Sequence, residues 1–223
     1  MPTRRTVRST ARSEPPSRAQ ALTAPPLPAT ARGLRARAEI ERAARSLFAS
    51  SGYLRTTVAD IATASGRSSA AFYQYFDSKE QLLVVLGNQF NDEVAERTRT
   101  ALRLEAGDDQ QFFRTAVGAY WDAYEANRGV MSALFQLATV DPDFAARQGQ
   151  IRAFGTEVIE HAFLRARRRG FSGNVDVALA ANALAAMFEH FVALALGPGA
   201  SVTVTRDQAV EAIATIWYRA TYA

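Results

Sequence analysis

Apolar residues recur at every third or fourth position along most of this chain, from about residue 35 to its end. This period places them on one face of an α-helix, and no segment shows the alternation typical of a half-buried strand. Glycine, proline and helix-capping residues divide the pattern into segments. The sequence therefore predicts an all-α protein of about nine helices. They include one over about 35–51, a long one from Ser78, and others that open near Asp109, Val130, Asp141, Asn174 and Thr205.

Two short helices with a tight turn between them are predicted just ahead of the long helix. Thr57 can cap the first of them, with Asp60 three residues later as in a capping box. Gly66 follows where a helix can end in the left-handed conformation that glycine enters at little cost. In the second helix, Phe72 and Phe76 are four residues apart and are expected to turn inward. Such a pair is a helix-turn-helix, whose second helix would enter the major groove of DNA.

This segment and the preceding helix share a specific pattern of positions. The positions are Ile40, Ala43-Ala44, Leu47-Phe48, Gly52-Tyr53, Thr56-Thr57-Val58, Asp60-Ile61-Ala62, Ala64-Ser65-Gly66, Ser68, Phe72-Tyr73, Tyr75-Phe76 and Ser78-Lys79-Glu80. In this pattern the chain resembles the TetR family of bacterial transcriptional regulators. The resemblance implies a three-helix DNA-binding domain (residues 34–80) followed by a helical ligand-binding and dimerisation domain (residues 81–223).

The outward face of the second short helix has no Lys, Arg or Asn, so affinity for DNA should come largely from the phosphate backbone. In the family, the positions that match Thr57, Tyr73 and Lys79 commonly contact phosphates. Arg67 replaces a small apolar residue that is usual in the family, and it either reaches a phosphate or points into solvent. Ala71 replaces a usual Thr or Ser, so the operator sequence cannot be transferred from relatives. The predicted DNA-binding residues are Thr57, Arg67, Ser68, Ser69, Ala70, Tyr73, Gln74, Tyr75 and Lys79.

A single helix-turn-helix makes few contacts with DNA. A two-fold dimer places two recognition helices about 34 Å apart and reads a palindrome. The family resemblance implies a homodimer whose partner is double-stranded DNA with a palindromic operator. It also implies that the dimer surface lies on the last two long helices. The Ala-rich stretch 178–186 would allow two helices to approach closely.

Several aromatic residues share faces in the C-terminal two thirds of the chain. Tyr120 and Tyr124 lie at i+7 and i+11 from Phe113, so the three share one face of a helix. Such residues form either a packed aromatic core or the wall of an apolar cavity. The family resemblance implies a cavity for a small hydrophobic or aromatic effector. The predicted ligand-binding residues are Phe113, Tyr120, Tyr124, Phe135, Phe154, Phe188 and Trp217.

Three short segments of this region are similar to EthR-type repressors, whose long pockets are apolar and aromatic. The implied function is a transcriptional repressor that a ligand releases from its operator through a shift between two populated states. A ligand-independent or activating regulator of the same fold stays open, as does a helical small-molecule carrier without a DNA function. The three segments are Phe113-Arg114-Thr115, Met187-Phe188-Glu189 and Ile216-Trp217-Tyr218.

Charge is unevenly distributed along the chain. Eight arginines against one glutamate give residues 1–37 a net charge of +7, which leaves −3 for the rest of a chain whose formal charge is +4. Residues 1–33 are rich in Pro, Ser, Thr, Ala and Arg and are predicted to be disordered. This tail is either a solvated leader or an electrostatic arm that contacts DNA. If it is an arm, deleting residues 1–32 weakens operator binding and flattens the slope of log K against log[salt].

The sequence offers no persuasive catalytic or metal-binding constellation. It has no cysteine and only two histidines, His161 and His190, which are far apart. It also lacks a glycine-rich phosphate loop and a paired set of carboxylates. We therefore expect neither an enzyme, a cofactor nor a metal site. The most apolar segment, Val177–Leu196, carries Asn182 and Glu189 and is expected to be a buried helix rather than a membrane span, in a cytoplasmic bacterial protein.

Overall fold

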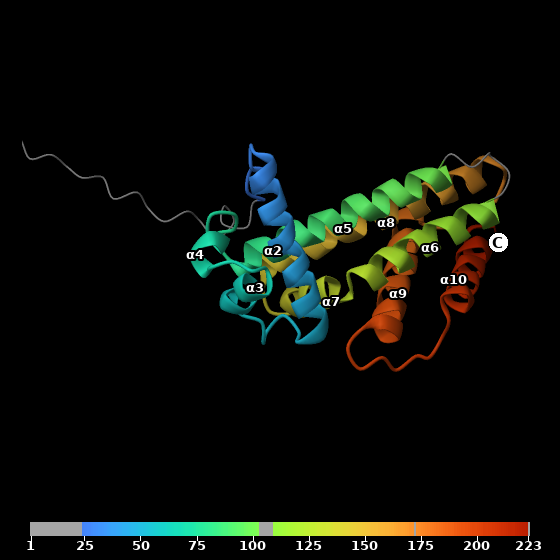
Figure 1. Cartoon of the computed structure of the whole chain (residues 1–223). Coiled ribbons are helices and arrows are strands. Elements are labelled where there is room, and N and C mark those ends of the chain that lie inside the picture. Colours follow the sequence, from blue (N-terminus) through green and yellow to red (C-terminus); the bar gives the residue numbers. More distant parts are fainter. Residues whose placement is uncertain (1–23, 103–108, 172, 223) are drawn as a thin grey trace, which may run out of the picture.

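In the computed structural model of the chain, residues 24–102, 109–171 and 173–222 are described, and every regular element among them is helical (Figure 1). This confirms the predicted all-α fold. The helices are α2 (Ala31–Ser50), α3 (Val58–Ala64), α4 (Ser69–Phe72), α5 (Lys79–Leu102), α6 (Asp109–Ala126), α7 (Arg128–Ala138), α8 (Pro142–Arg168), α9 (Val177–Leu196) and α10 (Arg206–Thr221).

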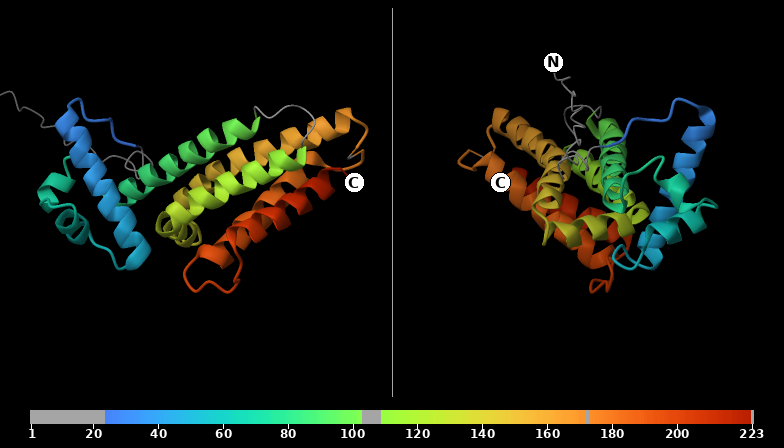
Figure 2. Two further views of the ribbon diagram at one scale, coloured as in Figure 1. Left: turned by 45° about the vertical axis from the view of Figure 1, so that its right-hand side comes forward. Right: turned by 90° about the vertical axis from the view of Figure 1, so that its left-hand side faces the viewer.

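The molecule is elongated, with α2, α3 and α4 gathered at one end and the other helices forming a long body (Figure 2). Helix α5 leaves this end and runs along the body beside α6. Helix α6 packs between α5 and α10, and α8 packs against α9. Helix α7 packs against both α8 and α2, so it joins the body to the end unit.

Helix α2 begins at Ala31, four residues before the predicted start. The reason is a cap that the prediction missed: the hydroxyl of Thr30 accepts a hydrogen bond from the amide of Gly33 at 3.1 Å. The last three residues of the predicted disordered tail (residues 1–33) are therefore helical, which corrects that boundary. The part of the tail up to residue 23 lies outside the described residues.

Two helix starts in the second half of the chain show how far the capping signals hold. Thr205 and Gln208 form the predicted capping box at the start of α10. Helix α9 was expected to begin after Asn174, but its N-cap is Asp176, whose carboxylate accepts a hydrogen bond from the amide of Leu179 at 3.1 Å. The carboxylate cap, which also complements the helix dipole, is therefore the one that the chain uses.

Candidate nucleic-acid interface and effector cavity

The turn between α3 and α4 has the geometry that its glycine predicts. Gly66 has a φ of +67°, in the left-handed region. Its amide donates to the carbonyl of Thr63 at 3.0 Å, and the amide of Arg67 donates to the carbonyl of Ala62 at 2.8 Å. These two bonds satisfy the last carbonyls of α3 in a Schellman motif. Backbone hydrogen bonds within the motif thus stabilise the turn between the two helices.

The second helix of the motif is shorter than the two turns that we expected. Ser68 caps α4 by accepting a hydrogen bond from the amide of Ala71 at 3.2 Å. Helix α4 then makes one turn, and the chain continues as hydrogen-bonded turns in which the amide of Phe76 donates to the carbonyl of Phe72 at 3.1 Å. Both phenylalanines are buried, with exposed fractions of 0% and 1%, which confirms that they turn inward.

The predicted outward face of this segment is indeed on the surface. Tyr73 is 54% exposed, and Ser69, Ala70 and Gln74 are exposed beside it. Tyr75 is half-buried and packs against the core. The structure therefore brings four of the predicted DNA-binding residues to one surface, which presents hydroxyls, an amide and a methyl group rather than charge.

Thr57 is held by hydrogen bonds within α3. Its hydroxyl donates to a carboxylate oxygen of Asp60 at 2.7 Å and accepts from the amide of Asp60 at 3.2 Å. Hydrogen bonds from the Thr57 side chain and backbone also lower the pKa of Asp60. Because the hydroxyl proton is used inside this confirmed capping box, which also occupies the amide of Asp60, a phosphate here would meet the amides of Val58 and Ala59, for which the first turn of a helix has no backbone acceptor.

The ammonium group of Lys79 faces the loop between α2 and α3. Its Nζ donates to the carbonyls of Tyr53 at 2.9 Å and Thr56 at 2.7 Å, and it lies 4.1 Å from the centre of the Tyr53 ring. Burial lowers the pKa of Lys79. Lys79, which was predicted to contact a phosphate, therefore also stabilises the loop that leads into the helix-turn-helix.

Lys79→Met is expected to lower the free energy of unfolding by about 1.5 kcal/mol, because two charge-assisted hydrogen bonds and a cation–π contact are lost. Urea unfolding would measure the change. Arg42→Met is the matched control, since it removes one positive charge from an exposed position on α2. An equal effect of both substitutions would show that Lys79 acts through net charge rather than through the loop.

Arg67 takes a position that neither predicted alternative described. Its Nη2 donates to a carboxylate oxygen of Glu39 on α2 at 2.6 Å. The guanidinium is partly buried between the two helices, and its Nε has no hydrogen-bond partner within the described part of the chain. Arg67 therefore ties the turn to α2 in this structure.

A second candidate site is a cavity of about 40 Å³ in the body, lined by residues of α5, α6, α8, α9 and α10. Of the seven residues predicted to bind a ligand, Tyr120, Phe154, Phe188 and Trp217 line it. The lining is completed by Val94, Thr98, Ala116, Gly155, Val158, Ile159, Ala185 and Glu189.

The other three predicted residues lie outside the lining. The ring of Phe113 packs behind Trp217 with centres 6.0 Å apart, and Tyr124 packs behind Tyr120 at 6.3 Å. Phe135 is not part of this wall, because it lies on α7, which packs against α2 and α8 and does not border the cavity. The sequence indicates that Phe135 lies on a helix other than that of Tyr120, but it does not indicate which part of the core that helix contacts.

The apolar wall contains one carboxylate, Glu189, that the sequence analysis did not predict as a site residue. Glu189 is 6% exposed and accepts a hydrogen bond from Nε of Arg152 at 2.8 Å, and Nη2 of Arg152 lies 2.8 Å from the same carboxylate oxygen in an ion pair. Burial raises the pKa of Glu189, while the hydrogen bond from Arg152 opposes this rise. The hydroxyl of Tyr120 and the indole Nε1 of Trp217 are buried without a hydrogen-bond partner among the described residues. A carboxylate inside an Ala-rich apolar helix was the available signal for this cluster.

Tyr120→Phe is expected to raise the free energy of unfolding by about 1 kcal/mol, because it removes a buried hydroxyl that has no hydrogen-bond partner in the part of the chain that the structure describes. The ring contacts with Phe90 and Phe188 stay in place. Thermal and urea unfolding of the purified variant would measure the change. A loss of stability of similar size would mean that the hydroxyl has a partner, such as an ordered water.

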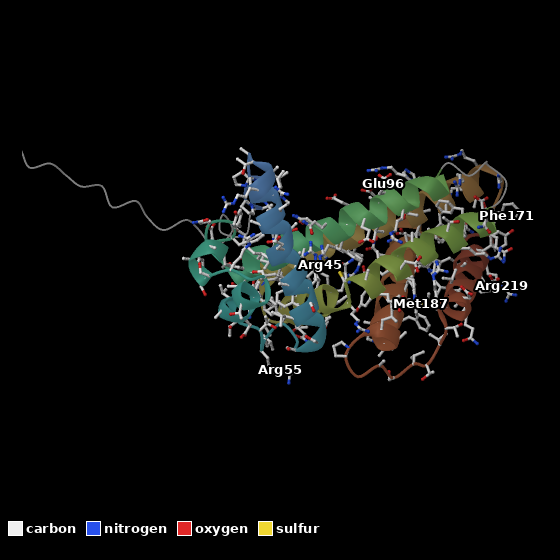
Figure 3. The ribbon with its side chains drawn as sticks, viewed as in Figure 1. Arg45, Arg55, Glu96, Phe171, Met187 and Arg219 are labelled. Carbon is white, nitrogen blue, oxygen red and sulfur yellow. The ribbon has the colours of Figure 1, made fainter. Side chains whose placement is uncertain are left out.

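A larger surface groove, about 510 Å³, lies where the two parts of the molecule meet. It is formed by the end of α2, the following loop, the start of α7 and the end of α9. Arg55 from the loop and Arg128 from α7 are at its rim (Figure 3 labels Arg55). This groove marks the junction of the two parts and contains Gly129, which lies against the backbone of Phe48 and Ala49 at the end of α2.

The helix-turn-helix and the body each have counterparts among known proteins. The sequence model of the family described as bacterial regulatory proteins, tetR family, matches residues 40–86, from α2 into α5. A crystal structure of the TetR family transcriptional regulator PfmR from Thermus thermophilus superposes with a TM-score of 0.66. It is 25% identical, over 81% of this chain and 97% of that one. The chain belongs to the TetR family.

Two curated TetR-type relatives are similar over part of their length. The HTH-type transcriptional repressor KstR2 of Rhodococcus jostii is 30% identical over 115 residues, which are 52% of this chain and 55% of that protein. The HTH-type transcriptional activator FasR of Mycolicibacterium smegmatis is 30% identical over 112 residues, or 50% and 51%. The chain therefore spans about half the length of the curated relatives it matches.

Proposed function

We propose that this TetR family protein is a transcriptional regulator that binds a palindromic operator as a homodimer. The observation that carries the proposal is the helix-turn-helix with its exposed outward face, which contains Ser69, Tyr73 and Gln74. Phe72 is buried in the core on the opposite side of the same helix. Affinity would come from phosphate contacts of first-turn amides and hydroxyls, and base reading from short polar and methyl groups. The protein would act in the bacterial cytoplasm, where its DNA is.

The proposed dimer surface lies on α9 and α10. By length and composition α9 could cross a membrane, with a mean hydropathy of 1.6, and 28% of that window is buried in the protomer. It is thus less buried than we predicted, because Leu179, Met187 and Leu194 lie along an exposed stripe (Figure 3 labels Met187). Ile216 of α10 is 44% exposed. A second copy is the proposed cover for this apolar surface.

The proposed control of operator binding is a small, mainly apolar effector in the body cavity. Five helices contribute to the cavity wall, and one of them, α5, begins at the helix-turn-helix. An effector that fits one arrangement of these helices better than another would shift the population of DNA-binding dimers. Of the two curated relatives, one is a repressor and the other an activator. We propose repression for this chain, with activation as the alternative.

A gel-shift titration against the chain's own upstream DNA tests this function, with size-exclusion chromatography to measure the dimer. Ala70→Glu places a carboxylate on the exposed face of α4 and should weaken operator binding by at least tenfold through repulsion from phosphate. Ala145→Glu adds the same charge to an exposed position on α8 and should leave binding unchanged. A monomeric chain, or equal binding by both variants, would contradict the proposal. A reporter gene under the same operator distinguishes repression from activation.

A further inference from the structure

Two side chains that line the body cavity have a hydrogen-bond donor without an acceptor among the described residues. The hydroxyl of Tyr120 and the indole N–H of Trp217 are fully buried atoms without partners in the described part of the chain. The two side chains come from α6 and α10, and both rings pack against Phe188, with centres 5.1 Å and 5.3 Å away. An unsatisfied buried donor is costly, and structures retain such groups where function uses them. Two such donors beside one cavity indicate a ligand that supplies an acceptor.

The charges around the cavity indicate that this acceptor is neutral. Arg152 is already paired with Glu189, through a hydrogen bond from its Nε and an ion-pair contact of its Nη2, both at 2.8 Å. The carboxylate of Glu189 lies close enough to raise the pKa of Tyr120 further above its ordinary range, beyond the effect of burial. A carboxylate ligand would therefore be repelled by Glu189 without gaining Arg152. An ammonium ligand would bring donors to an indole N–H that can only donate.

We propose that the effector is an uncharged, largely apolar molecule with one carbonyl-type oxygen, which accepts hydrogen bonds from Tyr120 and Trp217. This inference rests on the proposed function, since it names the chemistry of the effector in the same cavity. The oxygen can belong to a ketone, an ester, a thioester or an amide. The rest of the ligand contacts the apolar wall formed by Val94, Phe154, Val158 and Ile159.

The size of the cavity gives the ligand a way to act. A volume of about 40 Å³ has room for a few water molecules, so an effector of ordinary size must enlarge it. Enlargement separates helices that meet at this wall, among them α5 and α8. The ligand thus binds an expanded arrangement better than the closed one, which is the difference in affinity that a population shift requires.

The test compares two aromatic probes that differ in one group. Butyl phenyl ketone and pentylbenzene have the same shape, but the ketone has a carbonyl where the hydrocarbon has a methylene. Isothermal titration of the full chain should give about tenfold tighter binding for the ketone, because two hydrogen bonds exceed the cost of removing one carbonyl from water. The charged analogues phenylpentanoate and phenylpentylamine should bind more weakly than the ketone.

Conservative variants then assign the preference to the two donors. Tyr120→Phe and Trp217→Phe should each reduce the preference for the ketone, and the double variant should abolish it while retaining affinity for pentylbenzene. Tyr124→Phe and Trp121→Phe are the matched controls, because both residues are buried on α6 and neither lines the cavity. They should leave the preference intact.

Equal binding of the ketone and the hydrocarbon by the unmodified chain would overturn the inference, and so would the absence of ketone binding. Tightest binding of phenylpentylamine would overturn it in favour of a cationic ligand that uses Glu189. Gel shifts of the same samples keep the two proposals separate. A chain that prefers the ketone but binds no operator would support the proposed ligand chemistry and contradict the proposed function. Operator binding without a preference for the ketone would support the proposed function and contradict the ligand chemistry.

Discussion

Gly129→Ala is expected to lower the free energy of unfolding by about 3 kcal/mol, although alanine is the better helix former. Gly129 lies in the first turn of α7, where that helix crosses the end of α2. A β-carbon there would lie 2.4 Å from the amide nitrogen of Ala49 and 2.5 Å from the carbonyl carbon of Phe48. Both neighbours are backbone atoms, so no side-chain rotation can relieve the overlap.

The same substitution should affect DNA binding more than its effect on stability suggests. To restore a normal contact of about 3.5 Å, α2 and α7 must separate by roughly 1 Å. Helix α2 belongs to the helix-turn-helix unit and α7 to the body, so their separation reorients the DNA-binding surface relative to the proposed dimer surface. Because a palindrome requires a fixed distance between recognition helices, we expect operator affinity to fall by about tenfold or more.

A second glycine provides the control. Gly149 lies within α8, and a β-carbon there meets nothing within 4 Å. Gly149→Ala should therefore raise the free energy of unfolding by about 0.5–1 kcal/mol through helix propensity alone, and should leave operator binding unchanged. Urea unfolding and gel shifts on both variants measure these effects. If the two alanine variants changed stability in the same direction, the close approach of α2 and α7 would not be the reason for glycine at 129.

The parts of the interface that the sequence predicted are those governed by neighbours in the chain. Thr57 and Asp60 form a capping box, Gly66 adopts a left-handed turn, and Phe72 turns inward. Each feature depends on residues that are three or four positions apart. Such local interactions can be predicted from the sequence before the packing of the helices is known. The exposed face of α4 follows from the same periodicity.

The features that escaped prediction join residues far apart in the sequence. Lys79 reaches the carbonyl of Tyr53 across 26 positions, and Arg67 pairs with Glu39 across 28. The sequence alone does not distinguish a lysine that stabilises a loop from one that contacts a phosphate, because the difference depends on how the helices pack. The cavity shows the same limit, because seven aromatic residues were candidates and the packing of α6, α8, α9 and α10 selects four of them.

A buried polar network at the junction of the two parts also went unpredicted, and its removal is the second large effect that we expect. Asn127, 4% exposed, connects α6 to α7 and donates to Glu93 of α5 at 3.1 Å and to the carbonyl of Ala123 at 2.8 Å. Its side-chain oxygen accepts a hydrogen bond from Arg45 of α2 (Figure 3 labels Arg45). Arg45 also donates to Gln89 of α5 at 2.6 Å. The side-chain amide of Asn127 thus forms hydrogen bonds with helices from both parts of the molecule.

Asn127→Ala is expected to lower the free energy of unfolding by about 3 kcal/mol, because it leaves the guanidinium of Arg45 without one of its buried partners. Burial already lowers the pKa of Arg45, which indicates how poorly solvated this cation is. Arg45→Ala should be similarly destabilising, and the double variant should lose less than the sum of the two single changes. In a double-mutant cycle of urea unfolding curves we expect a coupling of about 1–3 kcal/mol between them.

The exposed ion pair between Arg114 and Glu211 is the comparison for this cycle. It also joins two helices, α6 and α10, with N–O distances of 2.7 Å and 2.9 Å, but it lies on the surface. Arg114→Ala should change stability much less, since water solvates the charges that remain. Equal losses from Arg114→Ala and Arg45→Ala would show that burial of the network at Asn127 contributes nothing. A larger loss from Arg45, together with weaker operator binding, would identify the network as the element that holds the DNA-binding unit on the body.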